Sequence, residues 1–414
     1  MKNTKINIDF NRLKATLEKS SSIGTIPGDG LRRLALSEED KKMRDIFLNW
    51  MKEAGLEIRI DEFGNMFGRR AGKANLTPIM IGSHLDTQPN GGRFDGVLGV
   101  LSALEVIRTL NDQQIETNRP IEVVNFTNEE GARFEPALLG SGGATGIFSL
   151  DYVYSRTDID GKTFDSELEH IGYKGEKQSP LSNIHAFIEL HIEQGPILEN
   201  EKKEIGVVQG VKGMTWMELK VTGSGGHAGP TPMNLRKDAL MKVANMIVYL
   251  EEKAKQWDEN LSVTIGRMHL SPGVVNCIPE EVVFSLDIRH VKDEIREQFI
   301  KETKQDLQDM CEQEQFQLSI TDLWQVSTTH FHSKIIKKIK EVAEELDLST
   351  RELYSGAGHD AKYMSDICPT GMIFLPSIGG ISHVEHELSL DSDIENAANV
   401  LLHTVLKLDN EQIK

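Results

Sequence analysis

Three side chains that suit a metal ion lie within the stretch 80–99, MIGSHLDTQPNGGRFDGVLG. His84 and Asp86 come at the end of an apolar run that has the pattern of a strand buried on both faces, and Asp95 follows in a glycine-rich loop. Imidazole and carboxylate groups are common ligands of divalent metals. The stretch therefore predicts half of a metal site.

The other half is expected after further apolar runs. Glu130 follows IEVVNFT, His191 lies near the end of HAFIELHIEQ, and His383 comes after MIFLP. Together with His84 and Asp95, these residues supply more carboxylate than one divalent ion needs, whereas two ions sharing Asp95 use the whole set. Zinc and manganese suit such ligands, as do cobalt and nickel, and two ions close together activate water for hydrolysis.

Each residue also has an ordinary structural interpretation. A histidine at a strand end can serve a structural hydrogen bond, Asp86 and Asp95 can cap turns or helices, and adjacent glutamates can be a solvated pair. Two carboxylates directly after a buried strand are costly without compensating charge, however, which favours the metal site. If Glu130 binds metal, Glu129 remains free as a general base, and Asp86 is placed to orient the His84 imidazole.

The elements around these residues predict an α/β fold. A strand at 78–82, a helix at 96–110 and a strand at 121–127 form a βαβ unit. This order indicates a mixed, largely parallel sheet with helices on both faces. Ligands bind beyond the carboxyl ends of the strands in such sheets, and the candidate residues fall at those ends.

A second, smaller unit interrupts this pattern. The sequence predicts a strand at 213–221, a helix at 234–255, strands at 262–270 and 280–290, a helix at 292–312 and a strand at 316–324. This β-α-β-β-α-β order is that of a ferredoxin-like α+β module. The predicted catalytic domain therefore comprises residues 1–211 and 327–414, and the inserted domain comprises residues 212–326.

Composition and charge exclude several classes of partner. The chain has 414 residues and a formal net charge of −18, so we expect it to bind neither nucleic acid nor an anionic membrane. The N-terminal segment has no apolar run that would form a signal peptide or a membrane span. The three cysteines are widely spaced, without a CxxC pair, which predicts a reducing, cytoplasmic location.

Six short motifs are spread over nearly the whole chain: HLD, FDG, NEEGARF, HIEQGP, GHAGPTP and GxSH. Together they resemble the M20 family of di-metal amidohydrolases. Within that family the chain is similar to the branch of N-carbamoyl-amino-acid amidohydrolases, β-ureidopropionase and allantoate amidohydrolase. The resemblance implies a catalytic domain interrupted by a lid domain that also forms a homodimer.

The resemblance also implies metal ligands and a base. It makes Glu129 the base that activates water and then protonates the leaving nitrogen. The implied ligands are His84 and His191 for one ion, Glu130 and His383 for the other, and Asp95 as the bridge between them.

Further residues are implied to bind substrate: Gln194, His227, Asn276, Arg289, Gly358 and His359. Lid closure is expected to bring Arg289 and Asn276 onto a substrate carboxylate, which a guanidinium binds through two hydrogen bonds. His227 is expected to reach the site from the partner subunit's lid and to stabilise the developing oxyanion.

Two features depart from simple family or motif patterns. The last motif, GGISHVEHE, lacks the proline usual after the metal histidine, and His386 offers a second imidazole; His383 is favoured because it follows Ile381-Ser382 at the matching place. The glycine cluster at 140–146 lacks both the GxGxxG spacing and a Lys-Ser/Thr ending, which argues against nucleotide binding.

The predicted activity is hydrolysis of the ureido C–N bond of an N-carbamoyl-L-amino acid or N-carbamoyl-β-alanine, giving amino acid, ammonia and carbon dioxide. Allantoate hydrolysis in purine catabolism is the enzymatic alternative. A metal-stabilised protein that binds small carboxylates without turnover is the non-enzymatic alternative, and it has no need of an unligated glutamate beside the metals.

Overall fold

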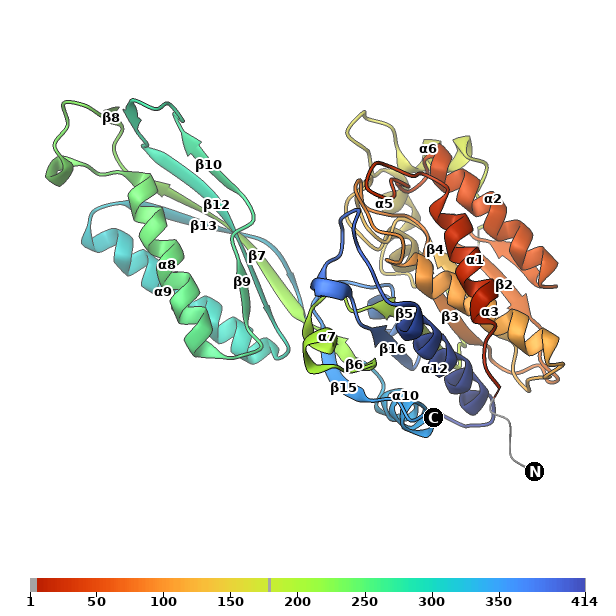
Figure 1. Ribbon diagram of the computed structural model, residues 1–414. Coiled ribbons are helices and arrows are strands. Elements are labelled where there is room, and N and C mark those ends of the chain that lie inside the picture. The colour runs from red at the N-terminus through yellow and green to blue at the C-terminus, as the bar shows by residue number, and fades with distance from the viewer. Residues whose placement is uncertain (1–5, 178–179, 414) are drawn as a thin grey trace. The chain divides into compact units, whose positions relative to one another are not determined.

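The centre of the larger sheet consists of four parallel strands that are buried along their whole length (Figure 1). They lie in the order β4 (Ile121–Phe126), β3 (Ile79–His84), β5 (Ala186–Ile192) and β16 (Thr370–Leu375). The computed structural model describes residues 6–177 and 180–413. The continuous apolar runs of these strands fit burial on both faces, as the sequence indicated.

Antiparallel strands extend this sheet on both sides. The hairpin of β1 (Glu57–Ile60) and β2 (Met66–Arg70) pairs with β4, and β6 (Ile205–Val211) pairs with β16. Beyond them, β6 is also paired with β14 (Thr329–His330) and β15 (Thr350–Ser355). The predicted mixed, largely parallel sheet is therefore confirmed.

Helices cover both faces of this sheet. On one face α3 (Val97–Asp112) and α12 (Asp391–Asp409) pack against each other and against the central strands, with α1 (Phe10–Ser21) beside α3 (Figure 1). On the same face, Ile335 and Ile339 of α10 (Ser333–Glu345) closely approach Gly371 of β16. Successive residues of a strand point to opposite faces, so Phe374, three residues after Gly371, points to the other face of the sheet. There its ring packs on His359, just before α11 (Ala361–Met364).

The remaining helices of this unit are shorter or peripheral. In α2 (Glu38–Glu53) the Ser37 side chain accepts a hydrogen bond from the Asp40 N–H and so acts as the N-cap. The others are α4 (Leu139–Ala144), α5 (Leu150–Tyr154), α6 (Phe164–His170) and α7 (Ile197–Glu201). Among all the described residues, no helix has both the length and the apolar character needed to cross a membrane.

Residues 211–329 form a second compact unit with its own sheet and core. Its antiparallel strands lie in the order β10 (Met268–Ser271), β12 (Glu281–His290), β7 (Gly213–Thr222) and β13 (Gln317–Val326), and β9 (Ser262–Thr264) also pairs with β12. Both α8 (Ala239–Trp257) and α9 (Asp293–Gln313) contact this sheet, and β8 (Gly226–His227) pairs with β11 (Cys277–Ile278). The order of these elements is the predicted ferredoxin-like one.

Most element boundaries in this unit lie within two residues of the sequence prediction, and two elements differ by more. Helix α8 begins at Ala239, whereas the sequence predicted a start at 234. The Asp238 side chain accepts hydrogen bonds from the Leu240 and Met241 N–H groups and so caps the helix there. The predicted strand 262–270 is two strands, β9 and β10, separated at Gly266, and both pair with β12. A glycine inside a strand pattern commonly marks such an interruption.

Candidate metal centre

The candidate ligands converge at the carboxyl ends of the parallel strands. His84 is the last residue of β3, Glu129 and Glu130 follow β4, and His191 is the penultimate residue of β5. The loop after β16 carries His383. Because these strands are parallel neighbours, their ends bring residues that are distant in sequence to one edge of the sheet.

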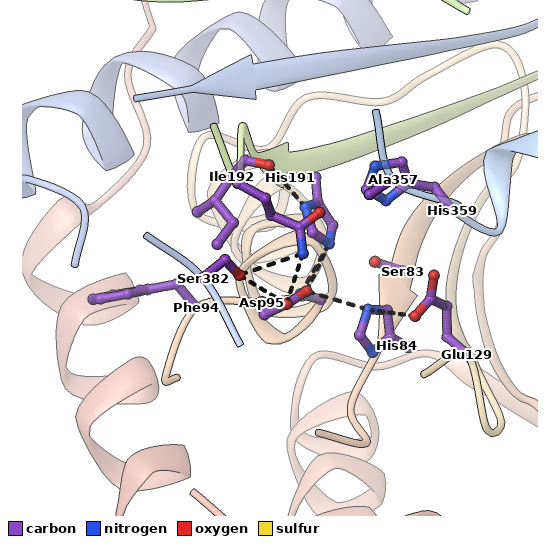
Figure 2. A network of polar contacts seen from close by, with 12 residues as sticks. Ser83, His84, Phe94, Asp95, Glu129, His191, Ile192, Ala357, His359 and Ser382 are labelled. Carbon is purple, nitrogen blue, oxygen red and sulfur yellow. Dashed lines mark hydrogen bonds and ion pairs between the residues drawn. The ribbon is translucent and has the colours of Figure 1, made fainter. Parts of the chain in front are cut away.

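Asp95 lies at the centre of this cluster, between Ser382 on one side and His84 with His191 on the other (Figure 2). Its Oδ1 is 3.1 Å from Nε2 of His191 and 3.7 Å from Nε2 of His84. Its Oδ2 is 3.2 Å from Nε2 of His383. Each carboxylate oxygen of Asp95 therefore faces a different set of imidazoles, which is the geometry required of a ligand that two ions share.

The donor atoms fall into groups of a size that fits metal ions. Two groups share Asp95, one with His84 and His191 and the other with Glu130 and His383, and within each the donor atoms lie within 4.8 Å of one another. A third group combines His191 with Glu189 and His359. The first two groups divide the five candidate ligands as the family resemblance implied.

The hydrogen bonds of two histidines also fit metal binding. Nδ1 of His84 donates to the Asp86 carbonyl at 3.0 Å, and Nδ1 of His191 donates to the Ile192 carbonyl at 2.9 Å. This tautomer leaves an unused lone pair on Nε2 of His84, whereas Nε2 of His191 accepts the Gly96 N–H at 3.2 Å. Nε2 of His84 is buried without a hydrogen-bond partner among the described residues, which suits a metal ligand better than a structural histidine.

Electrostatics favour cations at this position. Burial lowers the pKa of His84 to about 4, only partly opposed by the charge of Asp95, so this imidazole is neutral and able to bind metal. Burial, then the charge of Glu130, raises the pKa of Glu129 well above its usual range. The pKa of Glu130 is likewise raised by burial and by Asp95 and Asp86. Divalent ions would relieve the crowding of these carboxylates.

Glu129 and Glu130 differ in their surroundings although they are adjacent. Glu129 is only 6% exposed, lies outside all three ligand groups, and has its Oε2 3.5 Å from Nε2 of His84. The Glu130 carboxylate accepts a hydrogen bond from Nε2 of Gln88 at 2.7 Å, which fixes its direction. This division matches a ligand at 130 and an unligated base at 129.

Asp86 contacts its neighbours in a way that the sequence did not indicate. Its carbonyl, and not its carboxylate, orients the His84 ring; the carboxylate oxygen Oδ1 lies 3.9 Å from Nδ1 of His84. The carboxylate accepts hydrogen bonds from the N–H groups of Glu129 and Glu130, at 3.2 and 3.3 Å. Burial and the charge of Asp40 raise the pKa of Asp86 to about 7. Asp86 therefore orients the two glutamates through its side chain and His84 through its backbone.

The first unit also places three of the predicted substrate-binding residues near the cluster. Gln194 donates from Nε2 to Oδ2 of Asp95 at 2.9 Å. The buried His359 ring packs edge-on against His191 with 4.5 Å between ring centroids, and its Nε2 lies 2.9 Å from the Ser355 hydroxyl. Gly358, immediately before His359, is partly exposed.

The three remaining substrate-binding candidates belong to the second unit, which brings two of them together. His227 and Asn276 are exposed neighbours, since β8 pairs with β11 and the Asn276 carbonyl accepts a hydrogen bond from the Ala228 N–H at 2.9 Å. Arg289 pairs with Asp287 at 2.7 Å and is the penultimate residue of β12, near the end opposite to Glu281. The eight residue-to-residue steps of strand from Glu281 to Arg289 span roughly 26 Å. Asn276 and Arg289 of one chain therefore do not meet at one carboxylate, contrary to expectation.

Two buried glutamates beside the cluster were not found from the sequence. Glu189, on β5 two residues before His191, accepts hydrogen bonds from the Ser83 hydroxyl at 2.6 Å and the Ala361 N–H at 2.9 Å. The sequence feature that could have revealed Glu189 is a single glutamate within an otherwise apolar, buried strand. Glu387 is 2% exposed and lies four residues after His383, where nothing in the local sequence distinguishes it from the exposed His386.

Alanine substitution separates the two histidines of this loop. His383→Ala removes a donor from the group that contains Glu130, so we expect bound zinc to fall toward about one ion per chain after dialysis. His386→Ala changes an exposed side chain outside both groups and is expected to keep the wild-type zinc content. Zinc loss in the His386 variant, with normal content in the His383 variant, would reverse the assignment.

Comparison with known proteins gives a consistent family. Residues 80–407 match the model of peptidase family M20/M25/M40. The chain is 40% identical over 406 residues to the N-carbamoyl-L-amino-acid amidohydrolase of Rhizobium meliloti, covering 98% of this chain and 97% of that protein. It is 34% identical over 393 residues to the allantoate amidohydrolase of Escherichia coli strain K12, with 94% and 95% covered.

A solved structure agrees with these matches. The crystal structure of a hydantoinase/carbamoylase family amidase from Burkholderia multivorans has a TM-score of 0.95 and 42% identity, covering 98% of this chain and 99% of that one. The resemblance drawn from the motifs is thereby confirmed. The family match over residues 80–407 and these near full-length similarities establish that the chain belongs to peptidase family M20/M25/M40.

Proposed function

We propose that this protein is a metal-dependent amidohydrolase that cleaves the carbamoyl C–N bond of N-carbamoyl amino acids, releasing amino acid, ammonia and carbon dioxide. The observation that carries the proposal is the position of Asp95. Its Oδ1 lies 3.1 Å from Nε2 of His191, and its Oδ2 lies 3.2 Å from Nε2 of His383. The buried, unligated Glu129 lies beside this bridge. Relatives named as amidohydrolases of N-carbamoyl amino acids support the reaction class.

The residues proposed to hold two divalent cations, zinc or manganese, are His84, His191, Asp95, Glu130 and His383. Bound cations would supply Lewis-acid polarisation of the ureido carbonyl and a lowered pKa for water. Cobalt and nickel also suit these ligands.

Glu129 is proposed to move the protons of the reaction. A base must be within reach of the attacking water and must have a pKa near neutrality, and burial beside Glu130 raises the pKa of Glu129 in that direction. Glu129 takes a proton from the water and then delivers it to the leaving nitrogen. The backbone N–H groups of Glu129 and Glu130 donate hydrogen bonds to the Asp86 carboxylate, and these bonds hold the backbone of residues 129–130 in place.

Substrate binding is proposed for residues of both units. In the first unit, Gln194, Gly358 and His359 line the cluster from loops. In the second, Arg289 is proposed to bind the substrate carboxylate, and His227 with Asn276 to donate to the oxyanion or to substrate oxygens. Since one unit holds Arg289 away from the His227–Asn276 pair, we propose that each substrate meets these groups from two copies of the chain.

Assembly and location follow from the same proposal. A homodimer through residues 211–329 would supply the second copy, and we propose no nucleic acid or membrane partner because of the net charge of −18. The cysteines Cys277, Cys311 and Cys368 are all free, which supports a cytoplasmic location.

Allantoate is a second candidate substrate. It also presents a carboxylate and ureido groups, and the relative named allantoate amidohydrolase is 34% identical over 94% of the chain. The higher identity, 40%, of the relative named for N-carbamoyl-L-amino acids supports N-carbamoyl amino acids as the first candidate.

Ammonia release across a substrate panel tests the proposal. The panel contains several N-carbamoyl-L-amino acids, N-carbamoyl-β-alanine and allantoate, each with added manganese or zinc. We expect the highest kcat/KM for an N-carbamoyl amino acid. A higher value for allantoate would select the second candidate, and no ammonia from any of these compounds with metal-loaded protein would refute both.

A further inference from the structure

The carboxylate of Glu387 joins two loops that carry proposed metal ligands. Its Oε1 accepts hydrogen bonds from the backbone N–H groups of Phe94 and Asp95, at 3.0 and 3.1 Å. Its Oε2 accepts the hydroxyl of Ser382, directly before His383, at 2.7 Å. Phe94 and Glu387 are 293 positions apart in the sequence, so the contact fixes one loop relative to the other.

The Glu387 side chain is buried and packs closely against the backbone of Gly92. Glu387 is 2% exposed, and a Cβ added to Gly92 would lie 2.2 Å from its Cδ and Oε1. A buried carboxylate is costly unless donors compensate it, and here three donors from both loops do so. The carboxylate is therefore held in one place and holds both loops with it.

The Ser382 hydroxyl shows how this arrangement acts on Asp95. That hydroxyl has one proton and two carboxylate oxygens nearby, Oε2 of Glu387 at 2.7 Å and Oδ2 of Asp95 at 3.2 Å. The shorter distance favours donation to Glu387. Oδ2 of Asp95 accepts one hydrogen bond, from Nε2 of Gln194 at 2.9 Å, and its second lone pair then stays available on the side that faces His383.

We propose that Glu387 is a positioning residue of the metal centre: it fixes the Asp95 backbone and the Ser382 hydroxyl so that both oxygens of Asp95 are available to cations. This inference rests on the proposed function, since it requires metal ions at Asp95. Glu387 itself lies in neither of the two ligand groups that share Asp95.

Zinc binding by the full chain tests this role. Zinc affinity is measured on metal-stripped protein by competition with a chromophoric chelator, and the absorption spectrum is recorded after loading with cobalt. We expect Glu387→Ala to weaken zinc binding about 10–100-fold, the usual cost of losing an outer-shell partner, and to change the cobalt spectrum. Glu387→Gln keeps one oxygen for the two N–H groups and should lose less. His386→Ala, at the adjacent exposed position, is the matched control and should match wild type.

The outcomes separate this inference from the proposed function. Wild-type protein that binds no zinc would overturn the metal centre and the role of Glu387 together. Wild-type protein that binds zinc, with a folded Glu387→Ala variant of equal affinity and equal cobalt spectrum, would overturn the role of Glu387 alone. If the alanine variant does not fold, Glu387→Gln decides: wild-type affinity and spectrum would contradict the inference, and a loss in both would support it.

Discussion

Glu129→Gln is expected to bind metal as the wild-type protein does and to lose turnover by about 10²–10⁴-fold, the range that a general acid–base residue contributes. The amide has nearly the same shape as the carboxylate but takes no proton from water. Metal binding should persist, because Glu129 lies outside the groups formed by His84, His191, Asp95, Glu130 and His383. The measurements are kcat for ammonia release and bound metal per chain.

Glu116→Gln is the matched control for this variant. Glu116 is exposed and pairs only at the surface with Lys73 at 3.2 Å, so the same chemical change there should leave kcat unaltered. A Glu129→Gln variant with native kcat would remove Glu129 from the mechanism. One that loses both metal and turnover would instead make Glu129 a ligand.

Asp95→Asn should disturb both metals at once. Asparagine offers one oxygen where Asp95 offers two, and the amide nitrogen is not a ligand, so the sets at His191 and His383 cannot both keep their shared donor. We expect zinc affinity to fall by more than about 100-fold, beyond the usual loss of an outer-shell partner, and turnover to fall below detection. Zinc affinity is measured by competition with a chelator, and the number of bound ions is measured as metal content per chain.

Thermal unfolding gives a second measure of the same variant. Free metal at a hundred times the dissociation constant stabilises a wild-type site by about 2.7 kcal/mol, and this stabilisation should vanish in Asp95→Asn. Asp112→Asn is the control, because Asp112 is an exposed partner of Arg12 remote in sequence from every ligand. Loss of a single ion, with the other bound at native affinity, would show that Asp95 is not the bridge.

The central sheet and the candidate ligands were recognisable in the sequence for the same physical reason. Strands buried on both faces are continuous apolar runs, so an imidazole or carboxylate at their ends, such as His84 or Glu130, is conspicuous. Since the strands are parallel, their ends share one edge. Asp95 also belonged to this pattern through its glycine-rich loop.

Residues whose roles depend on contacts between distant loops were not predictable in this way. Glu387 has no local pattern that reveals its bonds to Phe94 and Asp95. The direction of the Asp86 carboxylate likewise depends on where the 129–130 backbone lies, which no spacing within 84–86 encodes. In the second unit, the start of α8 depends on which of several polar residues caps the helix. The structure shows that Asp238 is the cap.

The pairing of Asn276 with Arg289 failed for a related reason. The two residues are separated by few positions in sequence, but a fully extended β12 carries Arg289 away from the start of the strand. The expectation that the two residues meet came from the family resemblance and not from spacing, and the pairing of β8 with β11 instead makes His227 the neighbour of Asn276.

The most direct test of a metal-dependent N-carbamoyl amino acid hydrolase is ammonia release from N-carbamoyl-L-amino acids before and after metal removal. Protein stripped with chelator should release no ammonia above the rate of the Glu129→Gln variant, and added zinc or manganese should restore the activity. Undiminished ammonia release by the metal-free protein would contradict the account.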